Sequence, residues 1–327
     1  MRRRQFITLL GALAVAWPLV ARAQQPVMPI VGFLNSSSPG GYVPQVTAFR
    51  RGLNEAGYIE GRNVTIEYSW AEGHYDRLPE LAADLVRQKV TVITATTTAA
   101  VLAAKAATAT IPIVFEMASD PVTLGVVASL NRPLGNLTGV TNLGIEVGPK
   151  RPELLREILP TATTFGLLIN ASNPTLAEPT TRDVRAAART LGVQVHVVSA
   201  TRDNEIDHAF ASLAERRVDG LVIGSDPFFS SRSERLASLA LRYALPAVYQ
   251  WREFAVAGGL MSYGADTSDA YRLAGIYTGR VLKGDKPADL PVQQSTKVEL
   301  YINLKTAKTL GITIPLPLSG RADELIE

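Results

Sequence analysis

The stretch VTVITATTTAAVLAAKAATATIPIVFEM (residues 90–117) contains two apolar runs rich in Val and Ile, with an alanine-rich segment between them. The runs over 90–94 and 111–117 are typical of buried strands, and the segment over 98–108 is typical of a helix. A strand, a helix and a second strand in this order predict a right-handed βαβ unit with two parallel strands.

The same alternation continues on both sides of this unit. Upstream, the expected elements, alternately strand and helix, cover 28–34, 40–58, 63–70 and 75–89. Downstream we expect a helix over 120–130, after which the series restarts near Phe165 and runs to residue 250. The series therefore begins twice, near Ile30 and near Phe165. It predicts an α/β protein with two similar lobes, each a parallel sheet flanked by helices, and a boundary near 142–150.

The first residues, MRRRQFITLLGALAVAWPLVARAQQP, have the three parts of a secretory signal. Arg2 to Arg4 form a basic segment, Phe6 to Val20 an apolar one, and Ala21-Arg22-Ala23 a cleavage motif. The pattern predicts removal of residues 1–23 and a soluble periplasmic protein. Because Arg3 to Ile7 also resembles a twin-arginine signal, the export route stays open between that route and Sec. An uncleaved N-terminal anchor is the alternative.

Charge and cysteine content exclude several classes of site. The chain has 33 Lys and Arg against 30 Asp and Glu, but four of the arginines lie in the predicted signal. Its removal leaves 29 basic against 30 acidic residues, so nothing indicates a nucleic-acid partner. The chain has no cysteine, which excludes disulfides, thiolate metal sites, a cysteine nucleophile and a lipidated N-terminal cysteine.

Short polar side chains gather where the predicted strands end, and ligands of parallel α/β sheets bind at that edge. The polar segments after the strands are NSSSPGG (35–41), ATTT (95–98), ASDP (118–121), NASNP (170–174), SATRDN (199–204) and GSDP (224–227). Hydroxyls beside the free N–H groups of a helix N-terminus make a neutral anion site. Facing loops of this kind on two lobes predict a central cleft for a small polar ligand.

The same residue types are also the preferred helix N-caps, and Pro is favoured in the first helical turn. Capping alone explains either SDP segment, at 119–121 or at 225–227. One cap needs one side chain, however, and the runs of three serines and three threonines offer more. Both interpretations therefore stay open for any single residue of these loops. Tyr249, at a predicted strand end, is a candidate to stack on a ligand, with helix packing as the alternative.

Signatures of catalysis are weak in this sequence. The three histidines have no ligand-like spacing, and neither a G-x-S-x-G elbow nor a G-x-G-x-x-G loop occurs. The sequence therefore predicts no cofactor and no metal. A carboxylate pair of Asp120 and Asp226 would be needed for hydrolysis, and both lie in helix-cap contexts. A binding protein is the favoured class, a periplasmic sensor is the second, and a hydrolase is the third.

Three stretches resemble the solute-binding proteins of ABC transporters with the type I periplasmic binding fold, in the family that includes tryptophan- and tyrosine-binding members. They are GFLNSSSPGGYVPQVTAFRRGLNEAGYIEGRNVTIEY, IPIVFEMASDPVTLGVVASLNRPLGNLTGVTN and YINLKTAKTLGITIP. The resemblance implies that an amino acid or related ligand, possibly aromatic, is held between lobes hinged around a cleft and delivered to a permease. It maps the ligand-binding loops onto Ser36, Ser37, Ser38, Thr96, Thr97, Thr98, Asp120, Asn170, Ser172, Asn173 and Asp226. Asn142, at the predicted lobe boundary, is a further ligand-binding candidate.

The family's chain usually crosses between its lobes three times. By that resemblance, lobe 1 comprises residues 27–142 and about 266–297, and lobe 2 comprises 143–265 and about 298–327. Many members are lipoproteins with a cysteine after the signal. This chain has none, so a soluble monomer that partners an inner-membrane permease and its ATPase is expected. The identity of the ligand is not encoded in any of these patterns.

Overall fold

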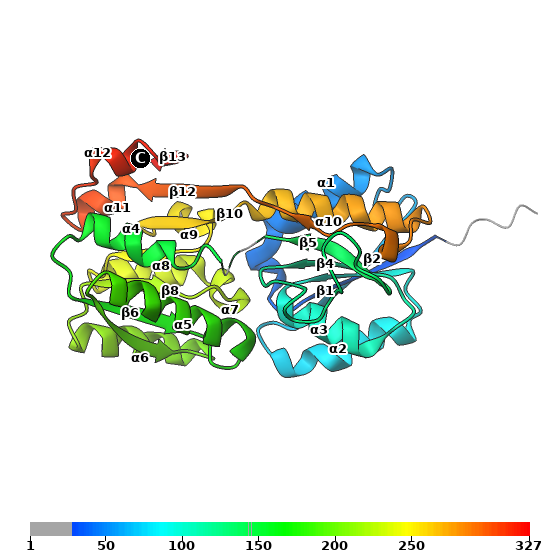
Figure 1. Cartoon of the computed structure of the whole chain (residues 1–327), viewed down its shortest axis with the longest axis horizontal. Helices are drawn as coiled ribbons and strands as arrows, with labels where there is room; N and C mark the ends of the chain where they lie inside the picture. The colour runs from blue at the N-terminus through cyan, green and yellow to red at the C-terminus, as the bar shows by residue number, and fades with distance from the viewer. Residues whose placement is uncertain (1–27, 143, 145) are drawn as a thin grey trace, which may run out of the picture.

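A computed structural model describes residues 28–142, 144 and 146–327. The predicted signal peptide and its cleavage motif lie outside the described residues. The described chain forms two lobes side by side, each a β-sheet with helices on both faces (Figure 1). None of the helices within the described residues is long and apolar enough to span a membrane.

Lobe 1 contains a sheet in the order β11-β5-β4-β3-β1-β2, and its described strand pairs are all parallel. Its strands are β1 (Ile30–Asn35), β2 (Thr65–Trp70), β3 (Val92–Thr96), β4 (Ile113–Met117), β5 (Leu137–Thr141) and β11 (Gln293–Gln294). Its helices are η1 (Pro39–Tyr42), α1 (Val43–Glu55), η2 (Tyr75–Arg77), α2 (Leu78–Arg87), α3 (Thr98–Ala107), α10 (Thr267–Leu282) and η3 (Pro287–Asp289).

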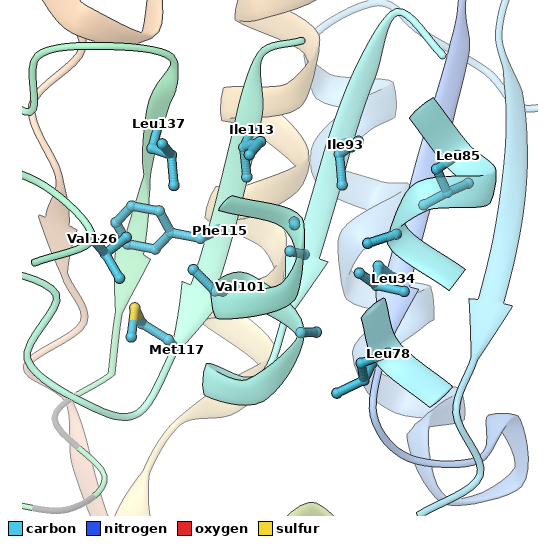
Figure 2. Packing of buried hydrophobic residues seen from close by; sticks show 14 of the residues in the cluster. Leu34, Leu78, Leu85, Ile93, Val101, Ile113, Phe115, Met117, Val126 and Leu137 are labelled. Atoms are coloured by element: carbon cyan, nitrogen blue, oxygen red, sulfur yellow. The ribbon is translucent and has the colours of Figure 1, made fainter. Parts of the chain in front are cut away.

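The two faces of this sheet are covered by different helix pairs. Helices α2 and α3 cover one face, and Figure 2 shows Leu78, Leu85 and Val101 from these helices against Leu34, Ile93, Ile113 and Phe115 from the strands. Helices α1 and α10 cover the other face and lie side by side (Figure 1). They approach closely because Gly52 and Gly275 have no side chains: a Cβ on Gly275 would lie 2.1 Å from the Phe49 carbonyl oxygen.

Lobe 2 contains a sheet in the order β13-β12-β10-β9-β8-β6-β7. Its strands are β6 (Thr164–Ile169), β7 (Gln194–Ser199), β8 (Gly220–Ile223), β9 (Ala247–Tyr249), β10 (Met261–Ala265), β12 (Val298–Asn303) and β13 (Glu324–Ile326). Its helices are α4 (Lys150–Ile158), α5 (Pro174–Thr190), α6 (Asp203–Glu215), α7 (Pro227–Ser230), α8 (Ser233–Arg242), α9 (Arg252–Val256), α11 (Leu304–Thr309) and α12 (Leu316–Ser319). Among the described strand pairs, β10 and β12 form the only antiparallel one.

The predicted fold class, two α/β lobes with parallel sheets, is confirmed. The helix expected over 120–130 was wrong, because the chain there forms turns. Gly125 adopts a left-handed backbone (φ +62°), and the N–H groups of Val126 and Val127 both donate to the Pro121 carbonyl. This path lets both valines reach the core beside Phe115 without a helix.

In the part of the chain that the structure describes, the backbone passes between the two sheets at three places. It leaves lobe 1 after β5, returns between β10 and α10, and leaves again between β11 and β12. Helix α10, drawn in orange in Figure 1, therefore belongs to lobe 1 although it follows most of lobe 2 in the sequence.

Candidate functional site

A cavity lies between the two lobes, at the carboxyl ends of the parallel strands. Its free volume in this structure is about 50 Å³, so the space between the lobes is narrow. Both lobes contribute to its wall, which consists of Gly41, Tyr42, Gln45, Thr97, Thr98, Glu116, Ala118, Asn142, Leu176, Ser225, Asp226, Pro227, Ser230, Trp251, Glu253, Phe254, Thr267 and Tyr271. None of these lining residues is a lysine, arginine or histidine.

The first turn of α3 forms one part of the wall. Thr97 is its N-cap: the side-chain Oγ1 accepts a hydrogen bond from the Ala100 N–H at 3.4 Å, and the Ser36 hydroxyl donates to the same oxygen at 3.0 Å. The backbone of Thr97 has φ +114°, a conformation that side chains rarely adopt. The helix itself cannot satisfy the N–H groups of Thr98 and Ala99, since they lie in its first turn. These two groups make the wall favourable for an anion.

Glu116 is the acidic group of lobe 1 in this wall. It lies near the carboxyl end of β4 and is 4% exposed. The Asn142 side-chain amide donates to its Oε1 at 2.6 Å. Burial raises the pKa of Glu116 to about 7, although hydrogen bonds from Asn142 and Tyr271 favour its ionised form. Because none of the described lining residues is basic, a ligand that carries a cation would supply an opposite charge for Glu116.

Asp226, from lobe 2, is equally buried but is fully engaged. Its carboxylate accepts hydrogen bonds from the Tyr75 hydroxyl at 2.8 Å, the Asn170 amide at 3.0 Å, the Asn173 amide at 2.8 Å and the Phe228 N–H at 2.9 Å. Burial raises the pKa of Asp226, and these four donors oppose that shift. Asp226 therefore organises the loops around the cavity, and Tyr75 is its single donor from lobe 1 among the described residues.

Aromatic rings line the remainder of the cavity. Tyr42 and Tyr271 come from lobe 1, with ring centroids 6.2 Å apart, and Trp251 and Phe254 come from lobe 2. The Trp251 indole N–H donates to the Ser230 hydroxyl oxygen at 2.9 Å, which fixes the orientation of that ring. The cavity thus offers an acidic group, a helix N-terminus and flat apolar surfaces to one small molecule.

The lobes are closed on each other around this cavity. Hydrogen bonds between described residues of the two lobes include those from the Ser37 hydroxyl to the Pro227 carbonyl at 3.1 Å, from the Tyr75 hydroxyl to Asp226, and from the Gln45 amide to Glu253 at 2.8 Å. Gly41 also lies against Ser231, where a Cβ would be 2.5 Å from the Ser231 Cα. The structure is therefore a closed arrangement with little room left inside.

The structure brings most of the residues predicted from sequence to this region. Thr97, Thr98, Asn142 and Asp226 line the cavity. A second group supports lining residues through side-chain or inter-lobe hydrogen bonds and comprises Ser36, Ser37, Asn170 and Asn173. Thr96 is buried behind the wall, where its hydroxyl oxygen accepts from the Asn35 amide at 2.8 Å.

Four predicted residues do not reach the cavity. Asp120 is exposed, and its carboxylate accepts from the Val122 N–H and the Thr123 hydroxyl, so it caps a turn. Ser38 precedes η1 without a side-chain capping bond. Ser172 is exposed and donates to Asn170. Tyr249 stacks on Phe254 in the core of lobe 2, with ring centroids 4.7 Å apart, and does not line the cavity.

The site residues predicted from sequence left out several polar lining residues, among them Gln45, Glu116, Glu253 and Tyr271. Glu116 had a signal that could have found it, because it is the one charged residue in the apolar run IPIVFEM. An acid inside a buried strand is rarely tolerated without a role. The other three lie in helices with ordinary amphipathic patterns and carry no comparable signal.

Comparison with known proteins agrees with this geometry. A model of the ABC transporter substrate binding protein family matches residues 37–326. A tyrosine-binding protein of Clostridioides difficile is 28% identical over 267 residues, which cover 81% of this chain and 75% of that protein.

Two solved structures are similar over nearly their whole length. A conserved domain protein of Vibrio cholerae has a TM-score of 0.82 at 26% identity, and the match covers 91% of this chain and 99% of that one. An ABC domain of Streptococcus pneumoniae in complex with L-Trp has a TM-score of 0.81 at 26% identity, with the same coverage. Since the family model spans almost all of the described residues, this chain belongs to the ABC transporter substrate-binding protein family.

Proposed function

We propose that this protein binds a free amino acid with an aromatic side chain between its lobes and delivers it to an ABC permease. The relative from Streptococcus pneumoniae holds L-Trp, and the relative from Clostridioides difficile is named for tyrosine. Four aromatic rings in the cavity wall of this chain support the same class of ligand. The protein acts by binding and release, without turnover of the ligand.

The observation that carries this proposal is the buried Glu116 in a cavity without basic side chains. The ammonium group of an amino acid would pair with Glu116, which Asn142 and Tyr271 hold in place. The ligand carboxylate would accept from the N–H groups of the first turn of α3, beside the Thr98 hydroxyl. One α-amino acid therefore pairs its ammonium with Glu116 and its carboxylate with the N-terminus of α3.

Closure explains how binding is communicated to the transporter. The inter-lobe hydrogen bonds of Ser37, Gln45 and Tyr75 form only when the lobes meet. A ligand held by both lobes favours the closed arrangement by its differential affinity for the two states. We propose that a permease recognises this closed form. Export to the periplasm as a soluble monomer, through the predicted signal at residues 1–23, is the second part of the proposal.

Calorimetry with L-tyrosine and L-tryptophan tests the proposal. Tyramine, which lacks the carboxylate, and 3-(4-hydroxyphenyl)propionate, which lacks the ammonium, serve as analogues. We expect binding of the amino acids and weaker binding of both analogues. Glu116→Gln should lower amino-acid affinity about 10- to 100-fold, because a hydrogen bond to a charged group contributes about 1.5–3 kcal/mol.

Asp120→Asn is the matched control, because it changes an exposed carboxylate that does not line the cavity. It should leave affinity unchanged. The absence of binding by any aromatic amino acid, or equal affinity of the Glu116→Gln variant and the parent, would remove the basis for this assignment.

A further inference from the structure

Gln45 and Glu253 form a second polar pair in the cavity wall, separate from Glu116. Gln45 comes from α1 of lobe 1 and is 5% exposed, and Glu253 comes from α9 of lobe 2. The Gln45 Nε2 donates to Glu253 Oε1 at 2.8 Å and lies 3.4 Å from the Thr267 hydroxyl oxygen. Glu116 has different partners, so the cavity holds two independent acceptor sites.

The orientation of the Gln45 amide follows from its partner. A carboxylate has no proton to donate, so the amide must present its nitrogen to Glu253. The amide oxygen, Oε1, is then directed elsewhere, and it is buried without a hydrogen-bond partner among the described residues. An unpartnered buried acceptor is costly, and such groups are rare in folded proteins.

We infer that Gln45 and Glu253 select ligands whose side chain carries a hydrogen-bond donor, and this inference rests on the proposed function. An α-amino acid has one ammonium group, and this group pairs with Glu116. The acceptors of Gln45 and Glu253 then require a second donor in the ligand. The phenol O–H of tyrosine and the indole N–H of tryptophan are such donors, and phenylalanine has none.

The same arrangement excludes phenylalanine more strongly than apolar packing would. A pocket lined only by apolar groups discriminates weakly between side chains of similar size. Gln45 Oε1 is buried, so a ligand that leaves it unpaired binds weakly because this acceptor has lost its contact with water. Glu253 is only partly buried and contributes less. We expect tyrosine to bind about 10- to 100-fold more tightly than phenylalanine.

The test compares L-tyrosine, L-tryptophan and 1-methyl-L-tryptophan with L-phenylalanine by calorimetry. In the wild-type protein, L-tyrosine should bind more tightly than L-phenylalanine, and N-methylation should weaken the binding of tryptophan. Gln45→Met keeps the length of the side chain but removes its amide. It should bring the affinity ratio of tyrosine to phenylalanine close to one. Glu253→Gln, which still offers an acceptor, should keep part of the ratio.

Gln194→Met is the matched control, because Gln194 is exposed on β7 and does not line the cavity. It should leave the ratio unchanged. Equal affinity of the wild-type protein for tyrosine and phenylalanine would overturn this inference while the proposed function stands. An unchanged ratio in Gln45→Met would also overturn it. The wild-type ligand series decides the matter even if a variant fails to fold, and the absence of binding by all four ligands would overturn both proposals.

Discussion

At the scale of single residues, Glu116 gives the site its chemical character. Its pKa is raised to about 7 because burial penalises the charged form more than Asn142 and Tyr271 stabilise it. The free protein therefore holds a carboxyl group that is readily protonated near neutral pH. An ammonium ligand favours the ionised form, so ligand binding and proton release are coupled at this position.

As long as Glu116 stays buried without ligand, the protein should lose stability as the pH rises from about 4.5 to about 7. Over this range the folded state binds more protons at Glu116 than the unfolded state, so the free energy of unfolding falls with pH, by at most about 1.4 kcal/mol per unit. Amino-acid affinity should rise over the same range, because the ligand requires the ionised form. Denaturant unfolding and calorimetry across this range measure both slopes.

Glu116→Gln is the control for this prediction, since an amide does not titrate there. The variant should lack both contributions, and any slope that remains would come from other groups, such as the buried Asp226. If the free energy of unfolding and the amino-acid affinity of the wild-type protein changed with pH in the same direction, this would contradict the assignment of the ammonium to Glu116.

At the scale of helices and strands, the site depends on how elements begin and how closely they pack. The loop from β3 to α3 is held by the Ser36–Thr97 hydroxyl contact and by the cap on Ala100. The α1–α10 pair in turn fixes Tyr42 and Tyr271, which lie at or near the starts of these helices. Substitutions that disturb the β3–α3 loop or the α1–α10 packing should therefore change the shape of the cavity wall without removing a direct contact to the ligand.

Thr97→Ala should lower the free energy of unfolding by about 0.5–2 kcal/mol, because it removes the N-cap of α3. Thr97→Gly also loses the cap, but glycine accepts a φ of +114° more easily, so we expect a smaller loss. Denaturant titration of the free protein measures both. Equal losses for alanine and glycine would show that the backbone conformation does not limit stability here, and no loss in either variant would show the same of the cap.

Gly275→Ala should destabilise lobe 1 by about 1–3 kcal/mol, because its Cβ would meet the Phe49 carbonyl oxygen and force α1 and α10 apart. Gly40→Ala is the matched control, since no atom lies within 4 Å of its added Cβ and its φ is not positive. That change should be nearly neutral. Similar unfolding midpoints for the two variants would show that the helices adjust without cost.

The order of elements was predictable from sequence, and the direction of individual side chains was not. Apolar periodicity is local, so the strands around residues 92 and 113 and the helix between them follow from a short window. Whether Tyr249 faces the cleft or the core depends on its place in β9 and on Phe254, a contact that sequence periodicity does not reveal. The polarity of the strand-end loops indicated where a site lies, yet Asp120 caps a turn outside it.

At the scale of the whole molecule, closure depends on a few contacts across the cleft. The Tyr75 hydroxyl joins lobe 1 to the Asp226 carboxylate of lobe 2, while the other three donors to Asp226 stay within lobe 2. When the lobes separate, Asp226 keeps those three donors and loses Tyr75. Tyr75 therefore contributes to the closed state alone.

Tyr75→Phe should weaken ligand affinity about tenfold or more, mainly through faster dissociation, because it removes a hydrogen bond to a charged group that forms on closure. The free protein should unfold at an unchanged denaturant concentration if its lobes are open. Stopped-flow kinetics and small-angle scattering with and without ligand provide the measurements. A loss of free-protein stability with affinity intact would assign Tyr75 to the fold rather than to closure.

The late position of α10 in the chain has a consequence for synthesis. Helix α1 packs through Phe49, Gly52 and Leu53 against α10, which follows it by more than two hundred residues. While the chain emerges from the ribosome, that face of lobe 1 has no partner until nearly the entire sequence has been made. The first lobe thus cannot finish folding ahead of the second, and a nascent chain of this design stays incompletely folded until translation is almost complete.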